Sequence, residues 1–458
     1  MSKRNLILLI IVLVVVVAII FGFFYFYRPA SQTTGTAQGT NFLANFLPFG
    51  TGKTTTPTST TTPVNVSGYV PPVTTTEVAN TSLKKVSSFP VAGFGVFMKE
   101  RFKDVANPTL TLPLSGDGSN TVPPAKGGSG GLKTTTPKPT APLTEFAPAL
   151  RYVEKATGNI YETFADSIDE RKFSSTIIPK VYDAYFGNTG QSVVMRYLKD
   201  DNKTIETFVG VIPKEYLGAD SSVANEITGS FLPENISDIS VSPDTSKIFY
   251  LFDTGNSIAG VTLNLQTNTK VQVFDSPFTE WLSSWPNSKM ITITTKPSVN
   301  EPGYVYAVNP DNQDLTKVLG GIKGMTTLTS PDGKMVLYGD NSLSLNVFDT
   351  DTGSSSLLGV KTLPEKCVWG SASDVVYCAV PKSIAEGDYP DSWYQGEVSF
   401  NDQIWKIDVK SGNTTMIADP FSTNGEDVDA IKLGLDGSQN YLFFINKKDS
   451  YLWELNLK

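Results

Sequence analysis

The sequence predicts an all-β protein whose folded domain is a β-propeller of four-stranded blades. Two observations lead to this fold class. From Ile177 onward no long stretch has helical periodicity, whereas short alternating runs of Val, Ile, Phe and Tyr recur between turns of Gly, Asn, Asp and Ser. One type of turn also returns every 41 to 45 residues, which is the length of a propeller blade.

The chain of 458 residues carries a candidate transmembrane helix at residues 5–27, after a cytoplasmic N-terminus of residues 1–4. The segment holds 23 uncharged residues dominated by Leu, Ile, Val and Phe, enough to span the hydrocarbon core of a membrane. We expect an uncleaved signal anchor rather than a cleaved signal peptide, because Arg28 and Pro29 follow directly. Lys3 and Arg4 precede the helix, so the positive-inside rule places the rest of the chain outside the cell membrane.

Two low-complexity tracts come next. Residues 28–82 are rich in Thr, Pro, Gly and Ser, and such a composition buries too little apolar surface to offset the entropy of ordering. We therefore predict a disordered stalk there. The propeller then takes residues 83–458, with a second tract at about 104–142 inserted in it. We expect this insertion between the second and third strands of the first blade.

The repeat rests on two kinds of turn. The first is found in "VSPDTSKIFYLF" at Val241, "SSWPNSKMITIT" at Ser283, "LTSPDGKMVLY" at Leu328, "GSASDVVYCAV" at Gly370 and "LGLDGSQNYLFFI" at Leu433. The second kind keeps the same phase and includes Glu154, Asn264, Asn309, Asp349, Asp408 and Asn456. Two hairpin turns in each repeat indicate four short strands.

We expect seven blades, with six as the alternative. The last repeat contains only three clear strands before Lys458. A strand from about Leu83 to Val91 would supply the fourth, which would close the ring and remove its exposed edges.

The turns Ser242-Pro243-Asp244 and Ser330-Pro331-Asp332-Gly333 resemble those of the WD40-like (TolB-type, PD40) repeat family. Such repeats occur in the propeller of the periplasmic protein TolB and in prolyl-oligopeptidase-type propellers. The resemblance covers about Leu83 to Lys458 and implies the fold. It carries over no catalytic residue, and other repeats depart from it, as at Trp285-Pro286-Asn287.

Composition excludes several classes of function. The chain has no histidine, which removes His-dependent triads, His zinc sites and His general bases. Residues 143–458 carry 25 Lys/Arg and 41 Asp/Glu, a net charge of −16 that argues against nucleic acid as a partner. The stretch "GTGKTTT" is similar to the end of a phosphate-binding loop, but Leu47 stands where the first Gly is needed. We expect no nucleotide, no metal and no cofactor.

Cys367 and Cys378 are the only cysteines. A hairpin turn between Ala372 and Ser373 would set them opposite each other, and an oxidising exterior would permit a disulfide. Two buried free thiols in the same layer are the alternative.

One loop is longer than its counterparts. The distance between the two markers of a repeat is 20, 22, 17 or 20 residues, but it is 35 from Ser373 to Asp408. The extra residues fall between the second and third strands of that blade. They include the candidate ligand-binding residues Tyr389, Trp393 and Tyr394, with flat aromatic faces, and Glu386, Asp388 and Asp391, with oxygen acceptors.

Aromatic faces beside carboxylates suit sugar rings, cationic peptides or a hard cation. The alternative is that Trp393 and Tyr394 fold back and hold the loop on its blade. Asp388 and Asp391 lack the alternation of a calcium loop, so a metal is not expected there.

These observations together predict a single-pass protein of the cell membrane with an extracytoplasmic C-terminal domain. We expect a binding or scaffolding module for a cell-envelope protein or glycan, rather than an enzyme. Two alternatives stay open. One is a propeller hydrolase or lyase that acts on envelope glycans through carboxylates, and the other is a ligand sensor coupled to a membrane partner.

Overall fold

The computed structural model describes residues 82–103, 143–218 and 224–458, which lie in one compact unit, Pro63–Lys458. The predicted transmembrane segment at 5–27, the stalk up to residue 81 and the tract at 104–142 lie outside the described residues. Within the described ranges, no helix is long and apolar enough to cross a membrane.

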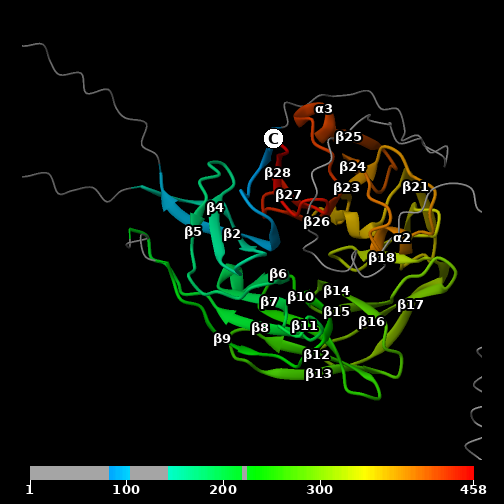
Figure 1. Cartoon of the computed structure of the whole chain (residues 1–458). Coiled ribbons are helices and arrows are strands. Elements are labelled where there is room, and N and C mark those ends of the chain that lie inside the picture. The colour runs from blue at the N-terminus through cyan, green and yellow to red at the C-terminus, as the bar shows by residue number, and fades with distance from the viewer. Residues whose placement is uncertain (1–81, 104–142, 219–223) are drawn as a thin grey trace, which may run out of the picture. The chain divides into compact units, whose positions relative to one another are not determined.

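The described residues form seven four-stranded antiparallel sheets, which are the blades of a β-propeller (Figure 1). The predicted fold class is confirmed, with seven blades rather than six. In blades 1 to 6 the strands pair in the order of the sequence, so that each blade is a simple meander. Antiparallel neighbours of this kind need only short turns, which explains the regular spacing of turn residues in the sequence.

The first and innermost strands of blades 1 to 7 are β2 (Val91–Phe102), β6 (Val181–Gly187), β10 (Ile236–Val241), β14 (Trp281–Asn287), β18 (Thr326–Thr329), β22 (Cys367–Trp369) and β26 (Ala430–Leu435). The second strands are β3 (Thr144–Glu154), β7 (Ser192–Leu198), β11 (Lys247–Asp253), β15 (Met290–Thr295), β19 (Met335–Gly339), β23 (Val375–Pro381) and β27 (Tyr441–Asn446).

The third strands are β4 (Ile160–Phe164), β8 (Ile205–Val211), β12 (Ile258–Asn264), β16 (Pro302–Val308), β20 (Ser344–Asp349), β24 (Asp402–Asp408) and β28 (Leu452–Asn456). The fourth strands are β5 (Arg171–Lys172), β9 (Thr228–Phe231), β13 (Lys270–Ser276), β17 (Leu315–Lys323), β21 (Ser355–Lys361), β25 (Thr414–Ala418) and, in blade 7, β1 (Leu83–Lys85). Short helical turns occur at η2 (Asn188–Gly190), η3 (Pro364–Lys366), α2 (Asp391–Tyr394) and α3 (Pro420–Asn424).

The repeated Ser-Pro-Asp turns connect first and second strands. After β18, the Ser330 hydroxyl donates to Asp332 Oδ1 at 2.6 Å, and the same oxygen accepts from the Lys334 backbone N–H at 3.0 Å. Gly333 has a φ of +76°, which suits glycine. The motif is therefore a self-contained turn. The end of the blades that carries these turns is called the Asp-turn face below, and the opposite end, which carries α2, is called the α2 face.

The first and last strands of the described chain close the ring. β1 pairs with β28 in antiparallel register, with Leu83 opposite Leu455 and Lys85 opposite Trp453. The N-terminal strand thus completes blade 7, as the sequence predicted, although it ends at Lys85 and Val91 already belongs to the innermost strand of blade 1. β28 is therefore paired on both sides, with β27 and with β1.

Apolar side chains fill the space between neighbouring blades. One cluster joins blades 5 and 6 and contains Leu345 and Val347 of β20 together with Trp369 and Trp405 of the next blade. Comparable clusters join blades 1 and 2, 2 and 3, 3 and 4, 6 and 7, and 7 and 1. Each blade buries its faces only against its neighbours, so an isolated blade would not be stable.

One expectation about the second low-complexity tract is wrong. We expected it between the second and third strands of blade 1, but its flanking residues belong to the first and second strands. Phe102 of β2 lies opposite Thr144 of β3, and Val91 lies opposite Glu154. The insertion point is therefore on the Asp-turn face, opposite to the α2 loop.

The two cysteines form a disulfide. Cys367 of β22 and Cys378 of β23 lie directly opposite each other, and their Sγ atoms are 2.09 Å apart. Of the two alternatives left open by the sequence, the structure has the cross-linked form. Closing a short loop of this kind stabilises a fold by roughly 3 kcal/mol in the entropic model.

Candidate functional site

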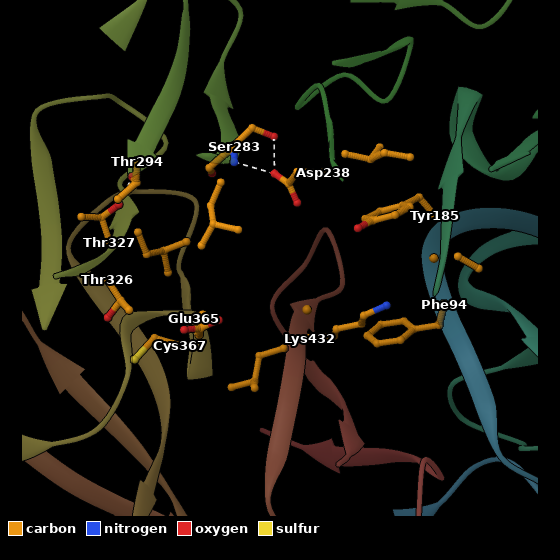
Figure 2. Close-up of a pocket in the computed structure, with 18 of the residues that line it drawn as sticks. Phe94, Tyr185, Asp238, Ser283, Thr294, Thr326, Thr327, Glu365, Cys367 and Lys432 are labelled. Carbon is orange, nitrogen blue, oxygen red and sulfur yellow. Dashed lines mark hydrogen bonds between the residues drawn. The ribbon is translucent and has the colours of Figure 1, made fainter. Parts of the chain in front are cut away.

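The inner strands of all seven blades surround a central cavity of about 640 Å³. Its lining is mixed. Aromatic rings come from Phe94, Tyr185 and Tyr394, and ionisable groups come from Asp238, Glu365 and Lys432. Figure 2 shows that Phe94, Tyr185, Asp238, Glu365 and Lys432 approach the cavity from different blades. The polar members of the inner strands stand at the third residue of β10, β14 and β26, so they gather toward the α2 end of the channel.

Lys432 is held by a buried carboxylate of blade 2. It pairs with Asp183 Oδ1 and donates to the Ala92 carbonyl at 2.9 Å. Asp183 Oδ2 accepts from Arg196 at 3.1 Å and from the Tyr185 hydroxyl at 2.9 Å. Burial opposes ionisation of Asp183, but the charges of Lys432 and Arg196 outweigh it, and the pKa of the carboxyl lies below its ordinary value. This group is therefore a permanent ion cluster at the channel wall.

Among the described residues, no cation pairs directly with Asp238, and Arg196 acts on it only through its more distant charge. Its Oδ2 accepts from the backbone N–H of Ser283 at 2.5 Å and from the Ser283 hydroxyl at 2.7 Å. Burial raises the pKa of Asp238 to about 6, because these neutral donors offset only part of the desolvation. The second carboxylate oxygen of Asp238 points toward the cavity (Figure 2). It is available to a ligand.

Glu365 is the other carboxylate of the channel. It lies in η3, between blades 5 and 6, and accepts a hydrogen bond from the Tyr394 hydroxyl of α2. Burial raises the pKa of Glu365 to about 7, and the charge of Asp238 contributes in the same direction. A carboxyl group that titrates near neutral pH can act as donor or acceptor toward a bound molecule.

Hydroxyl groups complete the wall. Thr294 and Thr327 share a hydrogen bond of 2.6 Å, and Thr326, Ser283 and Ser284 also line the cavity. Together with the two carboxylates, they make the channel a site of many oxygen atoms and a single lysine, which is already paired.

The insertion between β23 and β24 lies over the α2 face, and its predicted ligand-binding residues have different surroundings. Tyr389 and Trp393 are each 4% exposed, and Tyr389 donates its hydroxyl to the Ala385 carbonyl at 2.9 Å. Asp391 accepts from the backbone N–H of Val299, in the corresponding loop of blade 4, at 2.6 Å. Glu386 and Asp388 are exposed on the loop.

Only Tyr394 among these six residues lines the channel, where it is 39% exposed. Trp393 instead donates its indole N–H to Asp429 at 3.0 Å and packs on Phe400. Trp393 therefore packs inside the loop, whereas Tyr394 lines the channel. The ligand-binding role of the six residues stays a prediction.

Sequence reasoning missed Asp183, Asp238, Glu365 and Lys432. A usable signal exists for three of them. Each interrupts a short apolar inner strand at its third residue, as in "VYDAYFG", "ISDISV" and "AIKLGL". A charged residue at one register position in several blades indicates a polar layer at the axis of the propeller. Glu365 has no such signal, because it lies in a connection between blades.

A second cavity of about 540 Å³ lies beside the long β2–β3 hairpin on the Asp-turn face. Four of its five cations, all but Lys214, are already in ion pairs. Arg171 contacts Glu215 at 2.6 Å and Glu162 at 3.0 Å, and Arg151 contacts Glu162 at 2.8 Å. The second cavity therefore offers a ligand fewer unpaired polar groups than the channel does. Among the described residues, no group of three or more His, Cys, Asp or Glu side chains is arranged to hold a metal ion.

Comparisons with known proteins give little beyond the architecture. No protein-family model matches the chain, and no curated protein matches it. Among solved structures it is similar to an oligogalacturonate lyase in complex with manganese, at 10% identity and a TM-score of 0.43, over 68% of this chain and 85% of that chain. An oligogalacturonate lyase from Vibrio parahaemolyticus is similar at 7% identity and a TM-score of 0.44, over 68% of this chain and 86% of that one. Likeness at this level says nothing about activity.

Proposed function

We propose that this protein is a membrane-anchored, extracytoplasmic binding module whose ligand is a glycan of the cell envelope, held in the α2 end of the channel. The observation that carries the proposal is the combination of Asp238 and Glu365 with hydroxyl groups and aromatic rings around one cavity. Sugar hydroxyls donate to carboxylates, and the apolar face of a sugar ring stacks on aromatic side chains.

The charge of the channel favours a neutral or cationic glycan over an acidic one. Lys432 is neutralised by Asp183, whereas Asp238 and Glu365 face no cation of their own in the cavity. An acidic sugar would have to approach these two carboxylates. An envelope protein could present a lysine or a hydroxyl side chain to the same groups, and the test below distinguishes the two partners.

Membrane anchoring and the outward orientation rest on sequence. The apolar segment at residues 5–27 and the basic residues Lys3 and Arg4 support them. The WD40-like, TolB-type character of the blades rests on the Ser-Pro-Asp turns at Ser242 and Ser330. The membrane anchoring and the WD40-like character of the blades are therefore parts of the proposal.

A binding experiment tests the site. The full-length protein in detergent is offered to a panel of neutral, amino-bearing and acidic envelope glycans and to an extract of envelope proteins. Asp238→Asn is expected to weaken glycan binding about 10-fold, because a hydrogen bond to a charged acceptor contributes roughly 1.5–3 kcal/mol. Asp388→Asn is the matched control, since Asp388 is exposed on the insertion and does not line the cavity.

Binding that is equal for the wild type and Asp238→Asn would contradict the channel as the site. Retention of an envelope protein but of no glycan would contradict the ligand class.

A glycan hydrolase or lyase is the second candidate, and one observation favours it. Glu365 has a pKa of about 7 and is bonded to the Tyr394 hydroxyl, so it is poised to exchange protons near neutral pH. In that case Glu365→Gln abolishes turnover while the glycan still binds. A pure binding module shows no product with either chain.

A further inference from the structure

A lysine and two aspartates lie together in a dry part of the molecule, next to the channel but not among the residues that line it. Lys366 of η3, Asp402 at the start of β24 and Asp429 just before β26 are each 0% exposed. Lys366 Nζ lies 2.8 Å from Asp402 Oδ2 and also pairs with Asp429 Oδ1. The nitrogen therefore sits next to two carboxyl groups at once.

The surroundings are apolar. The rings of Trp393 and Phe400 have their centroids 5.3 Å from Lys366 Nζ, and both side chains are buried. Burying an ion pair is costly, because the charges lose their hydration. A neutral amide made from the ammonium and one carboxylate would remove that cost, and no solvent contact is available to hydrolyse it.

Asp429 is arranged as the reacting carboxyl. Its Oδ2 accepts from the Trp393 indole N–H at 3.0 Å, the Phe400 backbone N–H at 3.0 Å and the Ser399 hydroxyl at 3.1 Å. Three donors aimed at one oxygen stabilise the charge that develops there when a nucleophile attacks the carboxyl carbon. Lys366 Nζ contacts the other oxygen, Oδ1, which is bonded directly to that carbon.

Asp402 is arranged as the proton carrier. Its Oδ2 faces Lys366 and also accepts from the Ala430 backbone N–H at 2.8 Å, whereas its Oδ1 has no hydrogen-bond partner among the described residues. Burial raises the pKa of Asp402 to about 6. It can therefore take a proton from the ammonium and return it to a leaving oxygen.

We propose that Lys366 and Asp429 condense to form an intramolecular isopeptide bond, with Asp402 as the group that transfers the proton. The bond from Lys366 Nζ to Asp429 Cγ forms, and the bond from Cγ to Oδ1 breaks. The ammonium and the carboxylate together become one amide and one water molecule, so charge and atoms balance and no oxidant or cofactor is needed. Asp402 ends as it began.

The bond would link Lys366, which directly precedes β22 of blade 6, to Asp429, which directly precedes β26 of blade 7. Asp429 also accepts a hydrogen bond from the Trp393 indole N–H. The isopeptide bond would therefore stabilise the position of the insertion, whose Tyr394 lines the channel. The inference is independent of the ligand proposed above.

Mass spectrometry of the full-length protein tests the bond. After denaturation and reduction of the disulfide, the chain is expected to be lighter than its sequence by one water molecule. A tryptic digest is expected to join the peptide that contains Lys366 to the peptide that contains Asp429, without cleavage after Lys366. A full sequence mass with normal cleavage after Lys366, or a link between other residues, would overturn the proposal.

Lys382 and Asp419 provide an internal control, because their side chains lie 2.6 Å apart but are 25% and 15% exposed. This pair should remain unlinked and the chain should be cleaved after Lys382. Asp402→Asn keeps the shape of the side chain but removes the proton carrier, and is expected to show the full sequence mass with a cooperative melting transition retained. Condensation of Asp402→Asn to the wild-type extent would refute the role of Asp402, and the wild-type mass decides on the bond even where the variant does not fold.

Discussion

At the scale of single residues, two carboxylates near the channel differ because of their partners. Asp183 meets two cations, and its pKa lies below the ordinary value. Asp238 is hydrogen-bonded only by the neutral donors of Ser283, the charge of Arg196 acts on it more weakly, and burial raises its pKa to about 6. At Asp238 the hydrogen bonds from neutral groups do not offset the loss of hydration, whereas at Asp183 the nearby opposite charges do. A buried carboxyl group that is held by neutral donors, such as Asp238, therefore titrates closer to neutral pH.

Glu365 gives a prediction of this type. Its pKa is about 7 in the folded protein and near 4.3 in an unfolded chain, so the folded state binds more protons between these values. The stability that it contributes is complete below about pH 4, falls as the pH rises through 7, and is absent above it. We expect Glu365→Gln to stabilise the protein by about 1–2 kcal/mol at pH 8 and to have little effect at pH 4, since one pKa unit corresponds to about 1.4 kcal/mol and water in the channel reduces the effect.

Urea unfolding at pH 4, 6 and 8 measures this difference. Asp388→Asn serves as control, because Asp388 is an exposed carboxylate of the neighbouring loop. An equal dependence of stability on pH in the wild type and in Glu365→Gln would show that Glu365 is not the titrating group.

At the scale of elements, the position of the insertion could be predicted from sequence, but the contacts of its side chains could not. The interval from Ser373 to Asp408 predicted an insertion between the second and third strands, and the structure has it between β23 and β24. The partners of its side chains lie far away in the sequence. Trp393 contacts Asp429, and Asp391 contacts Val299, which is 92 residues distant. Spacing within one repeat carries no information about such contacts.

The packing of Trp393 leads to a second prediction. Replacing a buried Trp by Ala leaves a cavity and typically costs about 3–5 kcal/mol, and here Oδ2 of the Asp429 side chain also loses a donor. We expect Trp393→Ala to lower the free energy of unfolding by about that amount, as measured in urea. Tyr394→Phe is expected to change it by less than about 1 kcal/mol, because it removes only one hydroxyl at the open channel. A stable Trp393→Ala protein would show that the loop is not fastened by this side chain.

At the scale of the whole molecule, the propeller could be predicted because the repeat is local. The Ser-Pro-Asp turn is built from its own residues, as the bonds of Asp332 to Ser330 and Lys334 show, so related turns recur in blades 3 to 7. Blade 1 departs from the pattern. Its turn at Glu154 looks like the turns that follow third strands, yet it follows the second strand β3. That misassignment is the reason why the tract at 104–142 was expected on the wrong face.

The candidate site could not be predicted in the same way, because it exists only after the ring closes. Asp238, Glu365 and Lys432 come from blade 3, the start of blade 6 and blade 7. Because these three residues are far apart in the sequence, the sequence does not indicate that they line one cavity. Ring closure is thus the condition for both the fold and the proposed function.

Closure itself is testable at the seam. Deleting Trp453–Lys458 removes two fully buried side chains, Trp453 and Leu455, and leaves the edges of β1 and β27 without a partner. Each lost core side chain costs several kcal/mol, and together they approach the total stability of about 5–15 kcal/mol that a typical protein has. We expect the truncated protein to be insoluble or to melt without cooperativity, whereas deletion of the exposed Lys458 alone leaves the melting curve unchanged.

The other side of the seam gives the matched comparison. A chain that starts at Ser82 keeps β1, and a chain that starts at Ser88 lacks it. The first is expected to melt cooperatively and the second to lose several kcal/mol, because Leu83 and Val86 leave the core and β28 becomes an exposed edge. If both chains melted at the same temperature, β1 would not close the ring, and blade 7 would be stable with three strands.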